Sequence, residues 1–405
     1  MSEVETEKFK SPTYRLAEHT IDSKDIDSLI AWLRSGPWLT LGPKTREFEE
    51  RWARWIGTRH AVFVNSGSSA NLLMYAALLE SGRLPNRKVI VPAVSWATSV
   101  APAIQLGFEP ILCDADPDDW GLDCAHLESL LAEHRAAAVL GVHVLGVPFH
   151  ASKIRALQDE YDFVLLEDAC AATGSRFDGT LVGTFGAMST MSFYFGHHLS
   201  TIEGGMICTD DPEMYELLLM LRSHGWAKDL APAREAELAA EHSVHDFNRR
   251  FTFYIPGFNV RSTDLQAQIG LRQLDKVDTV VARRVENHEI YQERFLSAAR
   301  DDASTFSCQV SEGSVISSIS FAALAASREH RDRIGQVLAD HRIETRPVGG
   351  GNMSRQPFWS KRYGSIPLAM ADRIHDRGFH LPNNPDISTD DIAKIADIAL
   401  SVSPR

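Results

Sequence analysis

Short apolar runs alternate with amphipathic stretches over the first two thirds of the chain. Runs of strand length cover residues 61–64, 89–91, 111–113, 138–142 and 163–166. Between several of them lie helical stretches such as 71–79 and 126–132. Strands that alternate with helices in this way form a mostly parallel sheet whose faces the helices cover. We therefore expect an α/β fold.

The pattern changes at Leu271. From there an apolar stripe with charges opposite predicts one long helix, and the stripe consists of Leu271, Leu274, Val277, Val281 and Val285. Further along, the pattern predicts a strand at 314–322 and helices at 331–341 and 388–402. These elements indicate a second, smaller unit joined to the first by the helix.

Two domains also follow from the length, because 405 residues exceed what one hydrophobic core usually supports. We expect a large domain at 1–270, and a linking helix with a small α+β domain at 271–405. The charged, alanine-rich stretch 231–241 predicts a helical insertion on the surface.

Charge and hydropathy exclude several function classes. The formal net charge of -13 argues against nucleic acid as a partner, because such proteins need a broad basic surface. No run of 18 apolar residues occurs, and the N-terminus has no apolar signal core, so we expect no membrane span and a cytoplasmic protein. Five scattered cysteines without CxxC spacing predict reduced, buried thiols.

A small-residue turn links the first apolar run to the following helix. Gly67 and Ser68 lie at this turn, where free backbone N–H groups suit a phosphate and glycine allows close approach. A plain strand-to-helix turn capped by serine fits the same residues equally well. The turn alone therefore leaves a phosphate site open.

Two further side chains follow strands. Asp168 lies at the carboxyl end of the run 163–166, where ligand crevices of α/β sheets are found, and a protonated pyridine nitrogen would suit it. A helix cap is the alternative. Trp96 follows the run 89–91 and could stack on a flat cofactor, although a single tryptophan is more often part of the core.

His197 and His198 are adjacent. Neighbouring side chains of an extended segment point in opposite directions, and no Cys or His lies at helical spacing, so we expect no metal here. One histidine acting as a general base is chemically attractive, because its pKa lies near neutrality. A structural histidine remains the alternative.

The order and spacing of these features resemble the DegT-type sugar aminotransferase/dehydratase family, a branch of the fold type I pyridoxal phosphate enzymes. The matching motifs are 36–43, Asn65-Ser-Gly-Ser68, Glu167-Asp168, Glu203-Gly-Gly205, 257–264 and Leu381-Pro382. The resemblance implies a fold type I aminotransferase-like large domain and a cofactor that is pyridoxamine 5'-phosphate (PMP) or pyridoxal 5'-phosphate (PLP).

The resemblance also implies roles for single residues. The amides of Gly67 and Ser68 and the hydroxyl of Ser192 would hold the cofactor phosphate, and Asp168 would keep the pyridine nitrogen protonated. Trp96 would stack on the ring. Asn259 would reach the cofactor phosphate of a partner subunit, which implies a homodimer with shared active sites.

In the aminotransferases of this family a lysine binds the cofactor covalently where this chain has His197, and no lysine occurs between Lys153 and Lys228. Together with the stretch 350–357, this change resembles the PMP-dependent nucleotide-sugar 3-dehydratases. The resemblance is to the kind without an iron–sulfur cluster, such as GDP-4-keto-6-deoxymannose 3-dehydratase, because no cysteine follows residues 222–226 where cluster ligands would lie.

The resemblance implies that the substrate is a nucleotide-diphosphate 4-keto-6-deoxy sugar, which loses its C3 hydroxyl to give a 3-deoxy-4-ketosugar. His197 would be the catalytic base, and an amino donor such as glutamate would reload the cofactor. Two alternatives stay open: a sugar aminotransferase with a cofactor that is not covalently bound, and a non-catalytic relative that only binds the cofactor.

For substrate binding we single out His198, Arg261 and Arg355. The two arginines lie inside matched motifs and would supply cations for the diphosphate, as could three others, Arg249, Arg250 and Arg346. Ala171 departs from the family pattern, in which a Gln, His or acidic residue contacts the phenolic oxygen of the cofactor.

Overall fold

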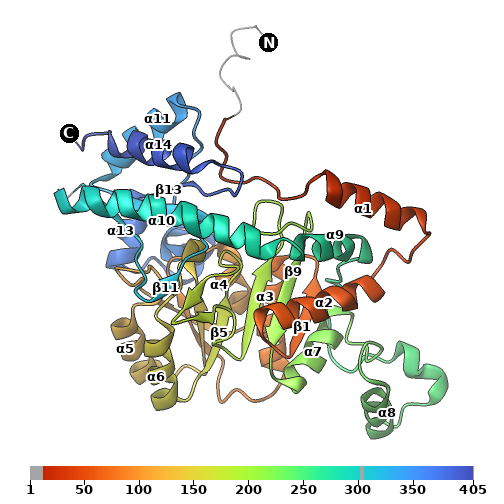
Figure 1. Cartoon of the computed structure of the whole chain (residues 1–405). Helices are drawn as coiled ribbons and strands as arrows, with labels where there is room; N and C mark the ends of the chain where they lie inside the picture. The colour runs from red at the N-terminus through yellow and green to blue at the C-terminus, as the bar shows by residue number, and fades with distance from the viewer. Residues whose placement is uncertain (1–11, 302–304, 405) are drawn as a thin grey trace, which may run out of the picture.

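A mixed sheet of seven strands forms the centre of the computed structural model, which describes residues 12–301 and 305–404 (Figure 1). The strand order is β1-β9-β8-β5-β4-β2-β3, and all pairs are parallel except those of β9, which is antiparallel to both neighbours. The strands are β1 (His60–Val64), β2 (Lys88–Pro92), β3 (Glu109–Cys113), β4 (Ala138–Val142), β5 (Val164–Asp168), β8 (Met188–Ser192) and β9 (Gly205–Thr209). The expected α/β fold is confirmed.

Helices cover both faces of this sheet, which explains its continuous apolar runs. One face packs against a core that includes Leu73, Met74 and Leu218, and the other against a core that includes Phe48 and Trp52. The helices of this part are α1 (Ser23–Arg34), α2 (Pro43–Ile56), α3 (Gly67–Glu80), α4 (Ala97–Gln105), α5 (Cys124–His134), α6 (Ala151–Tyr161), α7 (Pro212–Arg222), α8 (Pro232–Glu241) and α9 (Asp264–Leu274).

A second, antiparallel sheet follows in the sequence. It consists of β10 (Phe306–Cys308), β12 (Ser320–Ala325) and β13 (Gly378–Pro382), in the order β10-β12-β13. Its own core includes Tyr291, Phe295 and Phe321, which pack together with ring centroids about 5 Å apart. The helices here are α10 (Val277–Asp301), α11 (Arg328–Asp340), α12 (Pro357–Tyr363), α13 (Ala369–Arg377) and α14 (Thr389–Leu400).

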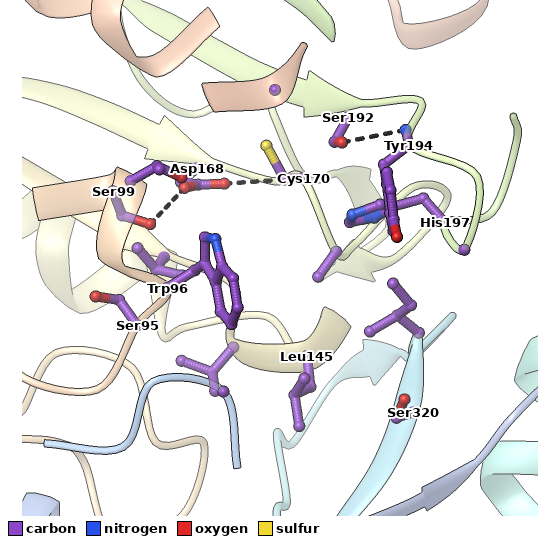
Figure 2. Close-up of a pocket in the computed structure, with 18 of the residues that line it drawn as sticks. Ser95, Trp96, Ser99, Leu145, Asp168, Cys170, Ser192, Tyr194, His197 and Ser320 are labelled. Atoms are coloured by element: carbon purple, nitrogen blue, oxygen red, sulfur yellow. Dashed lines mark hydrogen bonds between the residues drawn. The ribbon is translucent and has the colours of Figure 1, made fainter. Parts of the chain in front are cut away.

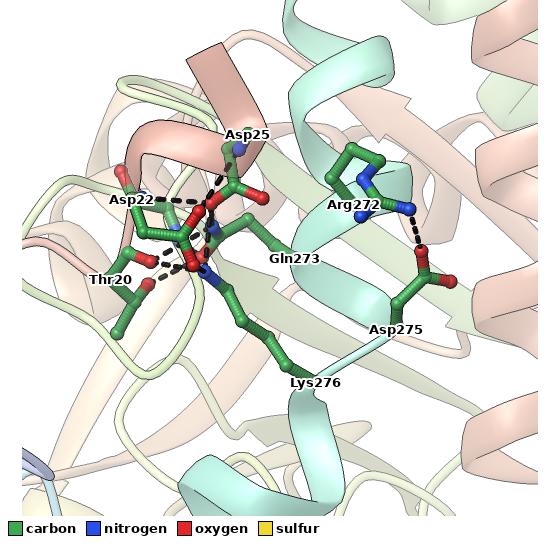
Figure 3. A network of polar contacts seen from close by, with 8 residues as sticks. Thr20, Asp22, Asp25, Arg272, Gln273, Asp275 and Lys276 are labelled. Atoms are coloured by element: carbon green, nitrogen blue, oxygen red, sulfur yellow. Dashed lines mark hydrogen bonds and ion pairs between the residues drawn. The ribbon is translucent and has the colours of Figure 1, made fainter. Parts of the chain in front are cut away.

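The single long helix expected from Leu271 is two helices. α9 ends at Leu274 and α10 begins at Val277, and polar contacts hold the residues between them (Figure 3). Lys276 Nζ bonds Asp25 Oδ2 at 2.8 Å and the carbonyl of Thr20 at 2.6 Å. Because these partners lie outside the apolar stripe, the stripe alone gave no sign of the break.

The strand expected at 314–322 is likewise divided. β11 (Ser314–Val315) joins a small sheet with β6 (Arg176–Phe177) and β7 (Thr180–Leu181), whereas β12 begins only at Ser320. Residues 316–319 therefore lead from the part built around the seven-stranded sheet, the first body, to the part built around the sheet β10-β12-β13, the second body. We call these residues the link.

The segment before α1 contacts elements that lie near the C-terminal end of the chain. Thr13 donates to the carbonyl of Arg342 at 2.8 Å, and Tyr14 Oη donates to Asp391 at 2.7 Å. The N-terminal segment of the large domain thus contacts the C-terminal part of the chain. Short 3₁₀ turns at 144–146, 246–251 and 353–355 complete the described elements.

The predicted surface insertion is helix α8, which stands at the edge of the molecule (Figure 1). Only Leu238 and Ala239 of this helix are buried. Within the described part of the chain, no helix is both long and apolar enough to cross a membrane.

Candidate active site

A cavity of about 680 Å³ opens at the carboxyl ends of the parallel strands (Figure 2). Ligand sites of open α/β sheets lie at this edge. On its other side the cavity is lined by Ile319 of the link and by Ser320, Arg346 and His380 of the second body. Of the predicted site residues, Gly67, Ser68, Trp96, Asp168, Ser192 and His197 all line it.

Asp168 is the last residue of β5 and is 6% exposed. Its Oδ2 accepts hydrogen bonds from Asn71 Nδ2 at 2.8 Å and from Ser99 Oγ at 2.7 Å, and its Oδ1 accepts one from the amide of Cys170 at 3.1 Å. Asn71 is in turn fixed by Thr190 Oγ1, 2.7 Å from its Oδ1. A carboxylate held by three donors is oriented rigidly and can receive a cationic N–H of a ligand.

The helix α3 begins at Gly67, directly at the cavity. Ser66 caps it by accepting from the amide of Ser69 at 3.1 Å, so the amides of Gly67 and Ser68 remain as free donors of the helix start. A Cβ at position 67 would lie 2.7 Å from Ser192 Cβ and 3.2 Å from Cys170 Sγ. Glycine is therefore required there, and an anion fits beside it.

Trp96 caps the start of α4 and is 65% exposed, although it lines the cavity. In Figure 2 the indole lies on one side of the cavity, with His197 and Tyr194 on the other. A large aromatic side chain that is exposed at a cavity offers a flat ligand a stacking surface.

His197 lies in the loop after β8 and is held by its amide, which donates to the carbonyl of Tyr194 at 2.9 Å. The Tyr194 ring stands edge-on to the imidazole, with 6.1 Å between centroids. Burial, followed by the charge of Arg284, lowers the pKa of His197 to about 4. The imidazole is therefore neutral at pH 7, and its Nδ1 has no hydrogen-bond partner among the described residues.

These groups fit a pyridoxamine or pyridoxal phosphate. The helix start at Gly67 suits the phosphate, the Asp168 carboxylate suits a protonated ring nitrogen, and Trp96 suits the ring face. The imidazole of His197, which lines the cavity, suits the reacting end of the group. Ala171 also lines the cavity, where its methyl group offers no polar contact.

Four predicted residues do not line the cavity of their own chain. Asn259 is exposed and accepts from Arg261 Nε at 3.0 Å. Arg355 makes ion pairs with Asp372 and Asp376 at 3.3 and 3.1 Å. His198 is fully buried, and its Nε2 lies 2.8 Å from the carbonyl oxygen of Ser317.

Several residues that line the cavity were not predicted as site residues. Asn71 and Ser99 lie one helical turn after Gly67 and Trp96, so helical spacing from the predicted residues could have found them. Arg346, one of the candidate cations for the diphosphate, does line the cavity, and so does His380, which was not predicted. Their segments meet where the His380 amide donates to the Arg346 carbonyl at 3.1 Å. Burial, followed by the Arg346 charge, lowers the pKa of His380 to about 4.

Among residues 12–301 and 305–404 no group of three or more His, Cys, Asp or Glu side chains is arranged to hold a metal ion. The cysteines are free thiols, with Cys113, Cys208 and Cys308 buried. Cys170 lines the cavity beside Asp168.

Similar sequences include sugar-modifying enzymes. A GDP-4-keto-6-deoxy-D-mannose 3-dehydratase of Yersinia pseudotuberculosis is 34% identical over 344 residues, which cover 84% of this chain and 85% of the relative. A dTDP-4-dehydro-2,6-dideoxy-D-glucose 3-dehydratase of Saccharopolyspora spinosa is 31% identical over 86% of this chain and 78% of its own.

Solved structures agree with these sequence relatives. A GDP-4-keto-6-deoxymannose-3-dehydratase with bound GDP-perosamine superposes with a TM-score of 0.86 at 30% identity, covering 96% of this chain and 100% of its own. The same kind of enzyme with a trapped PLP-glutamate geminal diamine gives a TM-score of 0.85 at 30% identity, with the same coverage of both chains. Residues 19–399 match a family model, and the chain therefore belongs to the DegT/DnrJ/EryC1/StrS aminotransferase family.

Proposed function

We propose that this protein is a PMP-dependent 3-dehydratase of a nucleotide-linked 4-keto-6-deoxy sugar. It removes the C3 hydroxyl to give a 3-deoxy-4-ketosugar, and the amino donor is glutamate. The observation that carries the proposal is His197: a neutral imidazole lines the cavity, and none of the described residues that line it is a lysine. An imidazole can move a proton but cannot tether the cofactor covalently.

Bound PMP supplies an amine that condenses with the sugar ketone and a ring that accepts electrons. The residues of this chain provide the rest. Gly67, Ser68 and Ser192 bind the phosphate, and Trp96 stacks on the ring. Asp168, which Asn71 and Ser99 hold in place, keeps the ring nitrogen protonated.

His197 acts as the base. Its depressed pKa means that the free imidazole is present throughout the neutral range, ready to take a proton from a carbon atom next to it. Ile319 and Ser320 form a wall of the cavity on its second side.

We further propose a homodimer with shared active sites. Asn259 and Arg261 bond each other at the surface rather than in their own cavity, which suits contact with the cavity of a partner subunit. The nearby Phe247, Phe251 and Phe253 are 88%, 74% and 55% exposed. Apolar side chains exposed together in this way are typical of interaction surfaces.

The products test the proposal. We would incubate the protein with PLP, glutamate and a panel of GDP-, CDP- and dTDP-linked 4-keto-6-deoxy sugars, and analyse the nucleotide sugars by mass spectrometry. A product that lacks one oxygen atom, with equal amounts of ammonia and 2-oxoglutarate, is expected. An aminosugar without free ammonia would instead identify an aminotransferase.

A further inference from the structure

His198 faces away from the cavity that His197 lines. Its side chain is fully buried, and its Nε2 lies 2.8 Å from the Ser317 carbonyl oxygen in the link. Because a carbonyl oxygen only accepts, the Nε2 of His198 carries the proton and donates it. The loop that bears His197 is thus attached to the segment that joins the two bodies of the protein.

Three of the four residues of the link, 317–319, are held by hydrogen bonds. The amide of Ser317 donates to Ser175 Oγ at 2.9 Å, and the amide of Ile319 donates to the Leu145 carbonyl at 2.9 Å. The carbonyl of Ile319 accepts from Arg284 Nη1 at 3.1 Å. Asn383 Nδ2 donates to the carbonyl of Ser318 at 2.9 Å. With residues 317–319 fixed in this way, the link is a rigid support for the loop that bears His197.

Close packing adds to this rigidity. A Cβ at Gly146, whose φ is +105°, would lie 2.6 Å from Ser318 Cα and 2.9 Å from the Ser317 carbonyl oxygen. The link therefore lies directly against the 144–146 turn. It cannot move toward that turn without a steric clash.

We propose that His198 is a positioning residue for the reaction: its hydrogen bond to Ser317 fixes the loop against the link, and so fixes where the imidazole of His197 stands in the cavity. This inference rests on the proposed function for the role of His197. Ile319, the last residue of the link, and Ser320, the first of β12, form a wall of the same cavity. The hydrogen bond between His198 and Ser317 then holds the His197 imidazole at a constant distance from this wall.

The charge state of His198 suits this role. Burial, followed by the charge of Arg284, lowers its pKa well below the ordinary value, while the Ser317 carbonyl and the neighbouring His197 act in opposite directions. A neutral ring with a single N–H makes one directed bond and carries no charge that would need a partner in the interior.

Three variants separate positioning from packing. His198→Leu removes the donor and leaves the Ser317 carbonyl buried without it. His198→Gln keeps an N–H at a similar distance. His330→Leu is the matched control, because His330 is also fully buried and its Nε2 also lies 2.8 Å from a backbone carbonyl, that of Val402. His330 lies outside the cavity.

Two readouts are measured on each variant. The first is the pH titration and line shape of the His197 ring in cofactor-free protein, followed by NMR of ¹⁵N-labelled histidine. The groups that act on this ring are Asp168, Arg284 and the Cys170 backbone, none of which the variants change. The second is kcat and KM of dehydration at saturating cofactor.

We expect His198→Leu to change the His197 signal and to lower kcat about 10- to 100-fold, with KM for the sugar nucleotide almost unchanged. His198→Gln should restore both, and His330→Leu should affect only thermal stability. If His198→Leu and His330→Leu behave alike in both readouts, or if His198→Gln is as impaired as His198→Leu, the positioning role is overturned.

Should His198→Leu not fold, His198→Asn takes its place, since its shorter polar side chain does not reach Ser317. A failure of the proposed function is recognised separately: wild-type protein would then form no deoxysugar, while the NMR comparison of the same variants still decides whether His198 positions His197.

Discussion

Ser99 Oγ donates a hydrogen bond of 2.7 Å to Asp168 Oδ2, and so connects the first turn of α4 to the carboxyl end of β5. Ser99 itself is only 1% exposed. One of the three donors that orient the carboxylate thus belongs to the same helix start that presents Trp96 to the cavity. Ring face and ring nitrogen of a bound cofactor would be held by one short element.

Removing the Ser99 hydroxyl should weaken cofactor binding. Ser99→Ala takes away one hydrogen bond to a charged group, worth about 1.5–3 kcal/mol, so we expect a roughly 10- to 100-fold higher Kd for PLP. An absorbance titration of cofactor-free protein measures it. Ser129→Ala is the control, because the Ser129 hydroxyl bonds only the carbonyl of Ala125 on exposed α5. Equal Kd values for both variants would contradict the role given to Ser99.

Placing a lysine at position 197 should convert the base into a tether. His197→Lys is expected to form a covalent PLP adduct that borohydride makes permanent, and to lose dehydratase activity, because the amine reacts with the cofactor aldehyde. Mass spectrometry of the reduced protein detects the adduct. His197→Asn, which cannot form it, serves as the comparison; full activity of that variant would show that His197 is not the base.

A methyl group at position 67 should disturb the phosphate site. In Gly67→Ala the new Cβ would lie 2.7 Å from Ser192 Cβ, so α3 or β8 must shift, and we expect a rise of at least about tenfold in the Kd of PMP. Gly335→Ala is the matched control. Its Cβ would meet only Thr345 Cγ2 at 3.9 Å, within helix α11, so PMP binding should not change and stability should rise slightly.

Acid should destabilise the protein between pH 6.5 and 4. Burial lowers the pKa of His197 and His380 to about 4 and that of His288 to about 3, so the unfolded chain binds protons that the folded chain does not. Stability from these groups is present above pH 6.5 and is lost as the pH falls. Each contributes about 1.4 kcal/mol per pH unit within its window.

Urea unfolding at several pH values between 4 and 7 measures this slope. The comparison variant is His288→Leu, which removes one of the buried imidazoles without touching the cavity; it should show a shallower slope, whatever its stability at pH 7. A slope equal to that of the wild type would mean that His288 does not contribute.

Shared active sites can be tested by mixing two inactive variants. His197→Asn and Asn259→Ala should each be inactive alone, whereas a subunit-exchanged mixture should regain about one quarter of the wild-type activity, because half of the dimers then hold one intact site. Activity is measured before and after exchange. No recovery despite verified exchange would place His197 and Asn259 in the site of a single subunit.

How much of this could be predicted from the sequence depended on how locally each feature is encoded. Strands such as β4 and β5 carry uninterrupted apolar runs, and they were predicted almost to the residue. β8 reads Met-Ser-Thr-Met-Ser, all buried, and has no such run because its polar side chains bond neighbouring elements, as Thr190 does with Asn71. Pattern alone could not identify it.

The site divides in the same way. Gly67 and Trp96 lie at helix starts and Asp168 ends a strand with an apolar run, so local sequence suffices to place them at one edge of a parallel sheet, whereas Ser192, at the end of β8, was indicated only by the family resemblance. His198, Arg346 and His380 depend on how the second body packs against the first, which no local pattern encodes. The direction in which two adjacent histidines face was decided by a contact with residue 317, far along the chain.

The pairing of Tyr14 with Asp391 spans 377 residues. During synthesis the first of these leaves the ribosome long before the second exists, and so do Thr13 and its partner Arg342. The segment around Tyr14 must therefore wait without its final contacts while the central sheet folds. Docking of this segment would be among the last steps of folding. In a ribosome-bound intermediate the segment should therefore stay accessible to proteases after the side of the cavity formed by the central sheet has folded.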